Sequence, residues 1–145
     1  MTENEQTQLR KEEVAQWMQS AQNDYDVAEY LWHGEYHPKP LEIICYHCSQ
    51  AVEKAIKALI VDLGKQGGLP QRHDMEFLLN QIKNILPKER GITITDELLD
   101  WAGQLSDFSV NVRYPNQMQI DENITRWAID KMERMVAWVK EALSD

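Results

Sequence analysis

Apolar residues recur every three or four positions along almost the whole chain, and this spacing constrains the fold more than any other feature of the sequence. An α-helix returns to the same face at this interval, whereas a strand does so at every second residue. Two long stretches with helical spacing, Val14–Trp32 and Leu41–Leu63, are separated by the loop Gly34–Pro40 with its two prolines. We therefore expect two long helices that pack as antiparallel neighbours.

Three further helices are indicated by apolar spacing together with residues that favour helix ends. Asp74 is a suitable N-cap for a short helix that ends before Pro87, and Thr95 is suitable for a fourth helix. A fifth helix is expected to begin at Asp121 and to continue to about Leu143. The helical pattern thus covers most of the chain.

The segment Ile92–Ile94 alternates with threonine as a strand would, but the chain offers no partner strand, so we expect a loop there. The sequence predicts an all-α fold, an up-and-down antiparallel helical bundle of about five helices, four of them long and one short. We expect residues 1–145 to form one domain with its core at about 14–143.

The charge of the chain restricts its partners. Lysine and arginine number 15 against 24 aspartate and glutamate, which gives a formal net charge of −9. Non-specific binding to duplex nucleic acid depends on a basic surface, which this composition lacks as a whole, although a local basic site is compatible with it. The first residues are polar and acidic, and no apolar run reaches the length of a membrane span. We expect a cytoplasmic protein without a membrane partner.

Cysteines and histidines could indicate a metal site, but their spacing does not favour one. Cys45 and Cys48 lie three residues apart on the apolar face of a predicted helix, which favours a place in the core. The histidines form no metal-binding motif with each other or with the cysteines; they are His33, His37, His47 and His73. We therefore expect no metal and no cofactor, with a nucleotide possible as a ligand.

The segment Val110–Asn116 interrupts the helical pattern with arginine, tyrosine and proline in succession. Because Pro115 disfavours helical conformation at Tyr114, Arg113 is expected at the end of a helix, where its side chain is displayed. A guanidinium matches phosphate or carboxylate. The candidate ligands of Arg113 are therefore a nucleotide, an RNA backbone or an acidic partner; in the alternative interpretation it forms a salt bridge with a nearby acidic residue.

A second candidate is a polar arc on the helix expected at Leu41–Leu63. At about 100° of rotation per residue, one arc of that helix contains His47, Gln50, Glu53, Lys54 and Lys57. His47, Gln50 and Lys54 could line a groove. In the alternative interpretation the arc is a solvated face that carries a Glu53–Lys57 pair.

Three segments together resemble the motifs of the HEPN domain family, and they follow the order expected for that family from Val14 to Leu143. Cys45–Ile60 resembles the family's Gln-Ala-x-Glu-Lys helix, Arg72–Leu79 resembles its His-Asp helix start, and a third segment resembles its Arg-Tyr-Pro turn. The matching residues are Gln50, Ala51, Glu53, Lys54, His73, Asp74, Arg113, Tyr114 and Pro115.

This resemblance implies an all-α bundle that dimerises and is often encoded beside a minimal nucleotidyltransferase in prokaryotic toxin–antitoxin pairs. It also implies a nucleotide or RNA ligand. Many HEPN toxins are metal-independent ribonucleases in which the active arginine is followed a few residues later by histidine. Here the residues after Arg113, Tyr114–Ile120, include no histidine, so the expected general acid or base is absent from its usual place.

The leading hypothesis is therefore a non-catalytic HEPN-like subunit that binds a nucleotide, a partner nucleotidyltransferase or both. Its expected ligand-binding residues are Arg113, Tyr114, His47, Gln50 and Lys54. The alternative is a metal-independent endoribonuclease toxin that uses Arg113 with a displaced histidine, His47 or His73. A structural partner without any ligand is a third hypothesis. A homodimer is expected in each case.

Overall fold

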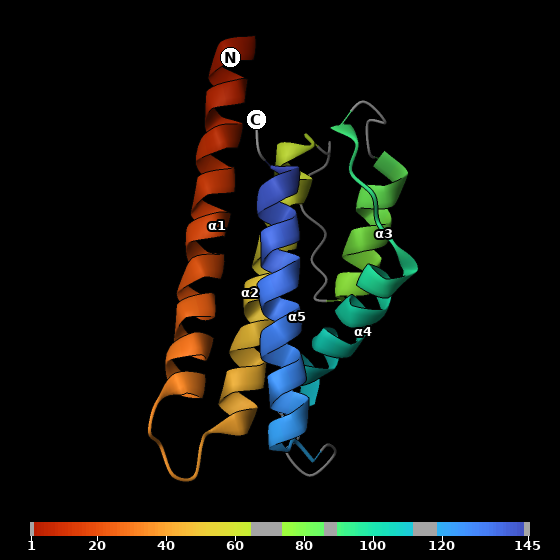
Figure 1. Ribbon diagram of the computed structural model, residues 1–145. Helices are drawn as coiled ribbons and strands as arrows, with labels where there is room; N and C mark the ends of the chain where they lie inside the picture. Colours follow the sequence, from red (N-terminus) through yellow and green to blue (C-terminus); the bar gives the residue numbers. More distant parts are fainter. Residues whose placement is uncertain (1, 65–73, 86–89, 112–118, 144–145) are drawn as a thin grey trace.

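The computed structural model describes residues 2–64, 74–85, 90–111 and 119–143, and in these residues it contains five helices and no strand (Figure 1). This confirms the predicted all-α bundle. The helices are α1 (Glu3–His33), α2 (Leu41–Asp62), α3 (Met75–Ile85), α4 (Asp96–Asn111) and α5 (Glu122–Ala142).

Helix α2 is the centre of the bundle, because it contacts each of the other four helices. It runs antiparallel to α1, with which it shares the most extensive contact, and it runs in the same direction as α5 (Figure 1). Most of its apolar side chains are fully buried, and these are spread along the helix; they include Ile44, Cys48, Val52, Ala55, Ile56 and Leu59. A helix buried on so many sides must also accommodate its polar residues inside the protein.

Helix α1 is longer than the apolar spacing predicts, since it begins at Glu3 rather than near Val14. Thr2 caps this end, because its hydroxyl accepts a hydrogen bond from the backbone amide of Glu5 at 3.1 Å. Acidic residues in the first turn lie close to the positive end of the helix dipole. The first turns project beyond the other helices (Figure 1) and are exposed, so no apolar face was needed there.

The caps predicted for α3 and α4, Asp74 and Thr95, are confirmed, and Asp121, where a helix was expected to begin, caps α5. In each case a side-chain oxygen before the helix accepts a hydrogen bond from a backbone amide in the first turn. The bonds run from Phe77 N to Asp74 Oδ1 (3.3 Å), from Leu98 N to Thr95 Oγ1 (3.1 Å) and from Ile124 N to Asp121 Oδ1 (2.8 Å).

The segment between α3 and α4 is a loop at Ile92–Ile94, as predicted. At its start, one nitrogen of the Arg90 guanidinium, Nη2, donates to Asp62 Oδ2 at 2.7 Å and to the backbone carbonyl of Ala142 at 2.8 Å. Arg90 therefore joins the C-terminal end of α2 to the C-terminal end of α5, and it satisfies a carbonyl that the helix leaves open.

Two carboxyl groups meet where α1 packs on α5. The pKa of Glu133 is raised to about 7, first because of its hydrogen bond with the carboxyl of Glu29 and then because of burial. Glu29 Oε1 is buried and has no further hydrogen-bond partner among the described residues, while its Oε2 lies 3.0 Å from His33 Nε2. Glu133 thus keeps its proton, which it can share with Glu29, up to about neutral pH.

We expect the stability of the protein to fall as the pH rises from about 5 to about 8. The folded state binds the proton of Glu133 more tightly than the unfolded chain does, so the stabilisation is complete below the ordinary pKa and is lost as the pH passes about 7. In Glu133→Gln the amide can donate to Glu29 without titrating, and this part of the pH dependence should disappear.

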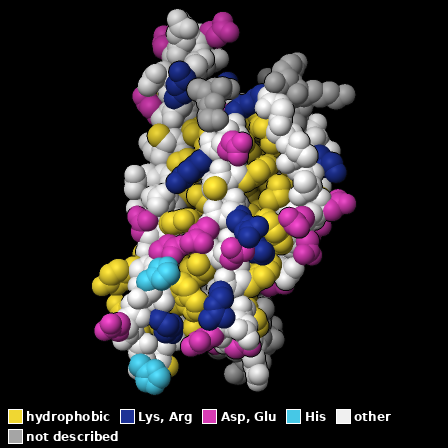
Figure 2. Space-filling model, in the orientation of Figure 1, with side chains coloured by type: hydrophobic (Ala, Val, Ile, Leu, Met, Phe, Trp, Pro, Cys, Tyr) yellow, Lys and Arg dark blue, Asp and Glu magenta, His cyan; other side chains and the backbone are white. Residues whose placement is uncertain are grey.

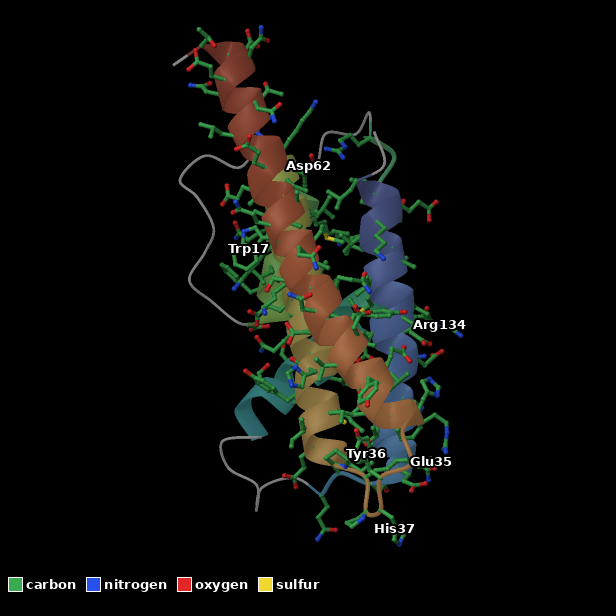
Figure 3. The ribbon with its side chains drawn as sticks, turned by 90° about the vertical axis from the view of Figure 1, so that its left-hand side faces the viewer. Trp17, Glu35, Tyr36, His37, Asp62 and Arg134 are labelled. Carbon is green, nitrogen blue, oxygen red and sulfur yellow. The ribbon has the colours of Figure 1, made fainter. Side chains whose placement is uncertain are left out.

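Denaturant unfolding over this pH range measures the effect. Glu35→Gln, in the exposed loop between α1 and α2 (Figure 3), is the matched control, and its pH dependence should equal that of the unsubstituted protein. Identical pH profiles for the two variants would contradict the shared proton.

Candidate functional site

The carboxylate of Asp24, on α1, contacts two polar side chains of α2. Asp24 is 9% exposed, and its two oxygens bind different partners. Oδ1 lies 2.8 Å from His47 Nδ1, and Oδ2 lies 2.7 Å from Lys54 Nζ. His47 and Lys54 are seven residues apart, which is about two helical turns, so both side chains meet the same face of α1.

The orientation of the imidazole follows from this contact. An ionised carboxylate only accepts hydrogen bonds, so Nδ1 of His47 is the donor to Asp24. Nε2, the other ring nitrogen, is left for another partner. The ring also contacts the edge of Tyr46, with 5.4 Å between ring centroids. The side chains of His47 and Lys54 are 27% and 26% exposed, so solvent and a ligand can reach them.

Two residues of α2 that follow His47 contact the last turn of α4. The amide of Gln50 donates to Ser109 Oγ at 3.1 Å, and the hydroxyl of Ser49 lies 2.7 Å from that of Ser109. Asp24, His47, Gln50, Lys54 and Ser109 are called the Asp24 cluster below. The described part of α4 ends two residues after Ser109, at Asn111.

The structure brings together three of the residues predicted from sequence, His47, Gln50 and Lys54. The other predicted residues, Arg113, Tyr114 and His73, lie outside the described residues. Sequence reasoning missed Asp24 and Ser109. For Asp24 a signal was present, because it lies between Ala21 and Ala28 in the apolar stripe of α1 and is therefore a polar residue in a buried position.

The interpretation of the polar arc as a solvated face is wrong. The predicted Glu53–Lys57 pair forms, with 3.0 Å between Oε2 and Nζ, but these residues are only 2% and 8% exposed. The ammonium of Lys57 lies 5.4 Å from the ring centroid of Trp17 on α1 (Figure 3). Helix α1 covers the arc because its aromatic and acidic side chains compensate the buried charges.

The cysteines belong to the core, as predicted. Cys45 Sγ donates to Thr125 Oγ1 on α5 at 3.5 Å, and burial raises the pKa of this thiol to about 11. Burial also raises the pKa of Cys48. Both thiols are therefore protonated and unreactive at neutral pH. Among the residues that the structure describes, no three His, Cys, Asp or Glu side chains are grouped so that they could hold a metal ion.

The surface carries charges of both signs. On the face shown in Figure 2, lysine and arginine alternate with aspartate and glutamate, and no continuous basic area is seen on that face. Within the described segments, no helix combines the length and the apolar composition that a membrane span requires.

Known proteins share both the sequence pattern and the fold. The sequence model of the HEPN domain matches residues 14–142. The crystal structure of TT1696 from Thermus thermophilus is similar, with a TM-score of 0.69 and 22% identity, over 90% of this chain and 98% of that one. ST0689, described as an archaeal HEPN homologue, is similar with a TM-score of 0.64, 25% identity and the same coverage. No curated protein sequence matches. Because the family model spans most of its length, the chain belongs to the HEPN domain family.

Proposed function

We propose that this HEPN protein is a non-catalytic subunit that binds a nucleotide at the Asp24 cluster, with Arg113 and Tyr114 as further contacts. The observation that carries this proposal is the position of Asp24 between His47 and Lys54. The carboxylate fixes two partly exposed donor side chains before any ligand arrives, which lowers the entropy lost on binding.

The chemistry of these donors suits a phosphate. Lys54 has three N–H donors and uses one of them for Asp24, and His47 has Nε2 available. The negative charge of Asp24 is balanced by the positive charge of Lys54, and the imidazolium form of His47 would add a second positive charge. Arg113 follows Ser109 by four residues, so its guanidinium would add a third charge close to the end of α4. Charge-assisted hydrogen bonds to a phosphate group would then provide most of the affinity.

The absence of catalysis is proposed from the missing histidine. Proton transfer by a positioned side chain contributes roughly 10²–10⁴-fold to a rate, and the residues after Arg113 supply no histidine for it. A chain that keeps the anion-binding arginine but lacks the proton-transfer group is better suited to binding than to cleavage. The partner proposed from the family resemblance is a minimal nucleotidyltransferase, in a prokaryotic toxin–antitoxin-like system.

One contact favours a second candidate function, a metal-independent endoribonuclease. The hydrogen bond from His47 to Asp24 orients the imidazole in the way that carboxylate–histidine pairs orient a general base. His47 would be the displaced histidine that acts together with Arg113.

We expect ATP to bind the unsubstituted protein and to bind Lys54→Met and Arg113→Ala at least about tenfold more weakly, because each variant loses a hydrogen bond to a charged group. Isothermal titration calorimetry measures this. Lys140→Met is the control for loss of one lysine, because Lys140 is exposed on α5 and contacts Gln22 and Tyr25 rather than the Asp24 cluster. Equal affinities in all four proteins, or no heat with any nucleotide at millimolar concentration, would refute the proposed site.

We expect purified protein to leave structured and unstructured RNA intact in the presence of a chelator, which excludes contaminating metal nucleases. Cleavage that persists with chelator and is lost in Arg113→Ala would instead support the endoribonuclease. In that case His47→Ala and His73→Ala, compared with each other, would identify the histidine that transfers the proton.

We also propose a homodimer, for which sedimentation equilibrium should give twice the chain mass of 17.0 kDa. Three large apolar side chains in and beside the turn between α1 and α2 are exposed, and they suit the centre of a protein contact; they are Tyr30 at 70%, Ile43 at 50% and Tyr36 at 43%. Tyr30→Ser with Ile43→Ser should shift the equilibrium toward monomer. A monomer at every micromolar concentration of unsubstituted protein would exclude the dimer.

A further inference from the structure

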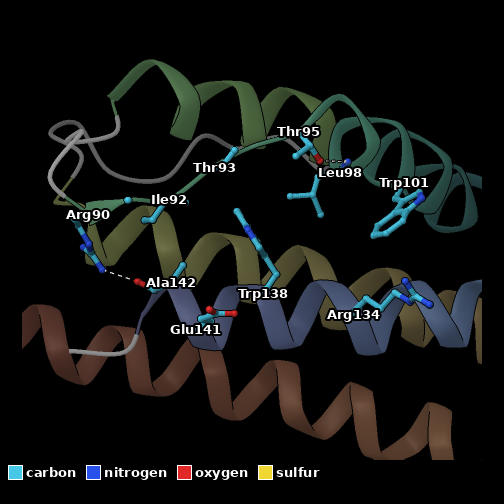
Figure 4. Close-up of a pocket in the computed structure, with 11 residues that line it drawn as sticks. Arg90, Ile92, Thr93, Thr95, Leu98, Trp101, Arg134, Trp138, Glu141 and Ala142 are labelled. Atoms are coloured by element: carbon cyan, nitrogen blue, oxygen red, sulfur yellow. Dashed lines mark hydrogen bonds between the residues drawn. The ribbon is translucent and has the colours of Figure 1, made fainter.

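A cleft lies between the first half of α4, with the loop before it, and the second half of α5 (Figure 4). Its volume is about 680 Å³, which is within the usual size of small-molecule sites. The side chains that define it are Ile92, Thr93, Leu98, Trp101, Arg134 and Trp138, and it is called the Trp138 cleft below. It has no lining residue in common with the Asp24 cluster.

The walls of the Trp138 cleft favour a flat ring. Trp101 extends into it from α4 and Trp138 from α5, so an indole lies on each side (Figure 4). Both indoles are only partly buried, while Leu98 closes the space between them at 8% exposure. Aromatic side chains bind planar rings by stacking, and they gain less from a branched aliphatic group.

The charges around the cleft favour one negative group at the Arg134 end. Asp130 accepts hydrogen bonds from both Lys131 Nζ at 2.9 Å and Arg134 Nε at 3.2 Å. One carboxylate is thus shared by two positive charges, which leaves one positive charge in excess. Lys131 is further held by the face of Trp101, with 4.5 Å from Nζ to the ring centroid. The side chain of Arg134 is 62% exposed and forms part of the lining, so its remaining donors can reach a ligand.

The opposite end of the cleft does not favour an anion. There the guanidinium of Arg90 is already neutralised by Asp62, and it also donates to the carbonyl of Ala142. Glu141, an acidic residue, also lines this end of the cleft (Figure 4). The position of the charges therefore favours one orientation of a bound ligand, with its negative group toward Arg134.

We propose that the Trp138 cleft binds a small molecule in which a flat aromatic ring carries one anionic group, with the ring between the two indoles and the anion at Arg134. Both a carboxylate and a phosphate satisfy this chemistry. The site is independent of nucleotide binding at the Asp24 cluster.

The test is a calorimetric titration with two probes and their matched fragments. Indole-3-acetate represents the aromatic carboxylates, with indole-3-acetamide and acetate as its uncharged and ringless counterparts. AMP represents the aromatic phosphates, with adenosine and ribose 5-phosphate as counterparts. At least one aromatic anion should bind at least about tenfold more tightly than both of its counterparts. The uncharged counterpart loses the charge-assisted hydrogen bond, and the ringless counterpart loses the ring stacking.

Variants locate the binding. Arg134→Gln should reduce the affinity for the aromatic anion to that for its uncharged counterpart. Arg126→Gln is the matched control, because Arg126 is on the same helix and lies over the indole of Trp32, but does not line the cleft. Trp138→Leu should weaken binding, and Trp138→Phe, which keeps an aromatic face and is less disruptive to folding, should restore most of it.

The outcomes separate this proposal from the proposed function. Binding of an aromatic anion that is lost in Arg134→Gln and kept in Lys54→Met supports the Trp138 cleft as its site. This holds whether or not ATP binds at the Asp24 cluster. AMP binding that is lost in Lys54→Met and kept in Arg134→Gln would assign AMP to the Asp24 cluster and overturn the phosphate form of the proposal. The whole proposal is overturned if neither aromatic anion binds at millimolar concentration, or if Arg134→Gln binds both probes normally.

Discussion

Asp24 carries a negative charge into the contact between the two longest helices, and Lys54 and His47 bind both of its oxygens there. Such a charge is tolerated only while its partners remain, and removal of one partner from a buried pair costs about 3–5 kcal/mol. The same condition holds farther along the helix pair, where Glu53 and Lys57 are buried together. Helix α2 can therefore lie at the centre of the bundle only because each of these charged side chains has an oppositely charged partner beside it.

The other contacts of α2 extend this dependence to the candidate site. Gln50 and Ser49 form hydrogen bonds with Ser109 in the last turn of α4, so the helix that leads toward Arg113 is positioned by the same turns of α2 that bind Asp24. At the far end of α2, Asp62 is joined through Arg90 to the end of α5. A substitution that loosens the contact between α1 and α2 would consequently disturb the candidate site, because Asp24 belongs to that contact.

Features that depend on neighbouring residues could be predicted from the sequence, and features that depend on distant ones could not. Apolar spacing and side-chain caps are local, so all five helices were found, together with the starting residues of four of them. The spacing carries no information where a helix is exposed on all sides, which is why the start of α1 at Glu3 was missed. The burial of Glu53, the contact of Asp24 with α2 and the meeting of Glu29 with Glu133 each require knowledge of which helix covers which face. A polar arc on one helix shows only that polar partners are needed, and solvent or another helix can supply them.

The unequal packing along α1 has a consequence for how its backbone opens. From Glu3 to Glu13 every residue is exposed, whereas Ala21 and Asp24 are buried against the bundle. Amide protons in the exposed turns can exchange with solvent whenever the helix end frays, but those near Asp24 exchange only when α1 separates from α2 or the whole protein unfolds. One continuous helix thus contains two regimes of hydrogen exchange. The boundary between them marks the point at which tertiary contacts, rather than the intrinsic preference of the residues for helix, begin to hold the backbone in place.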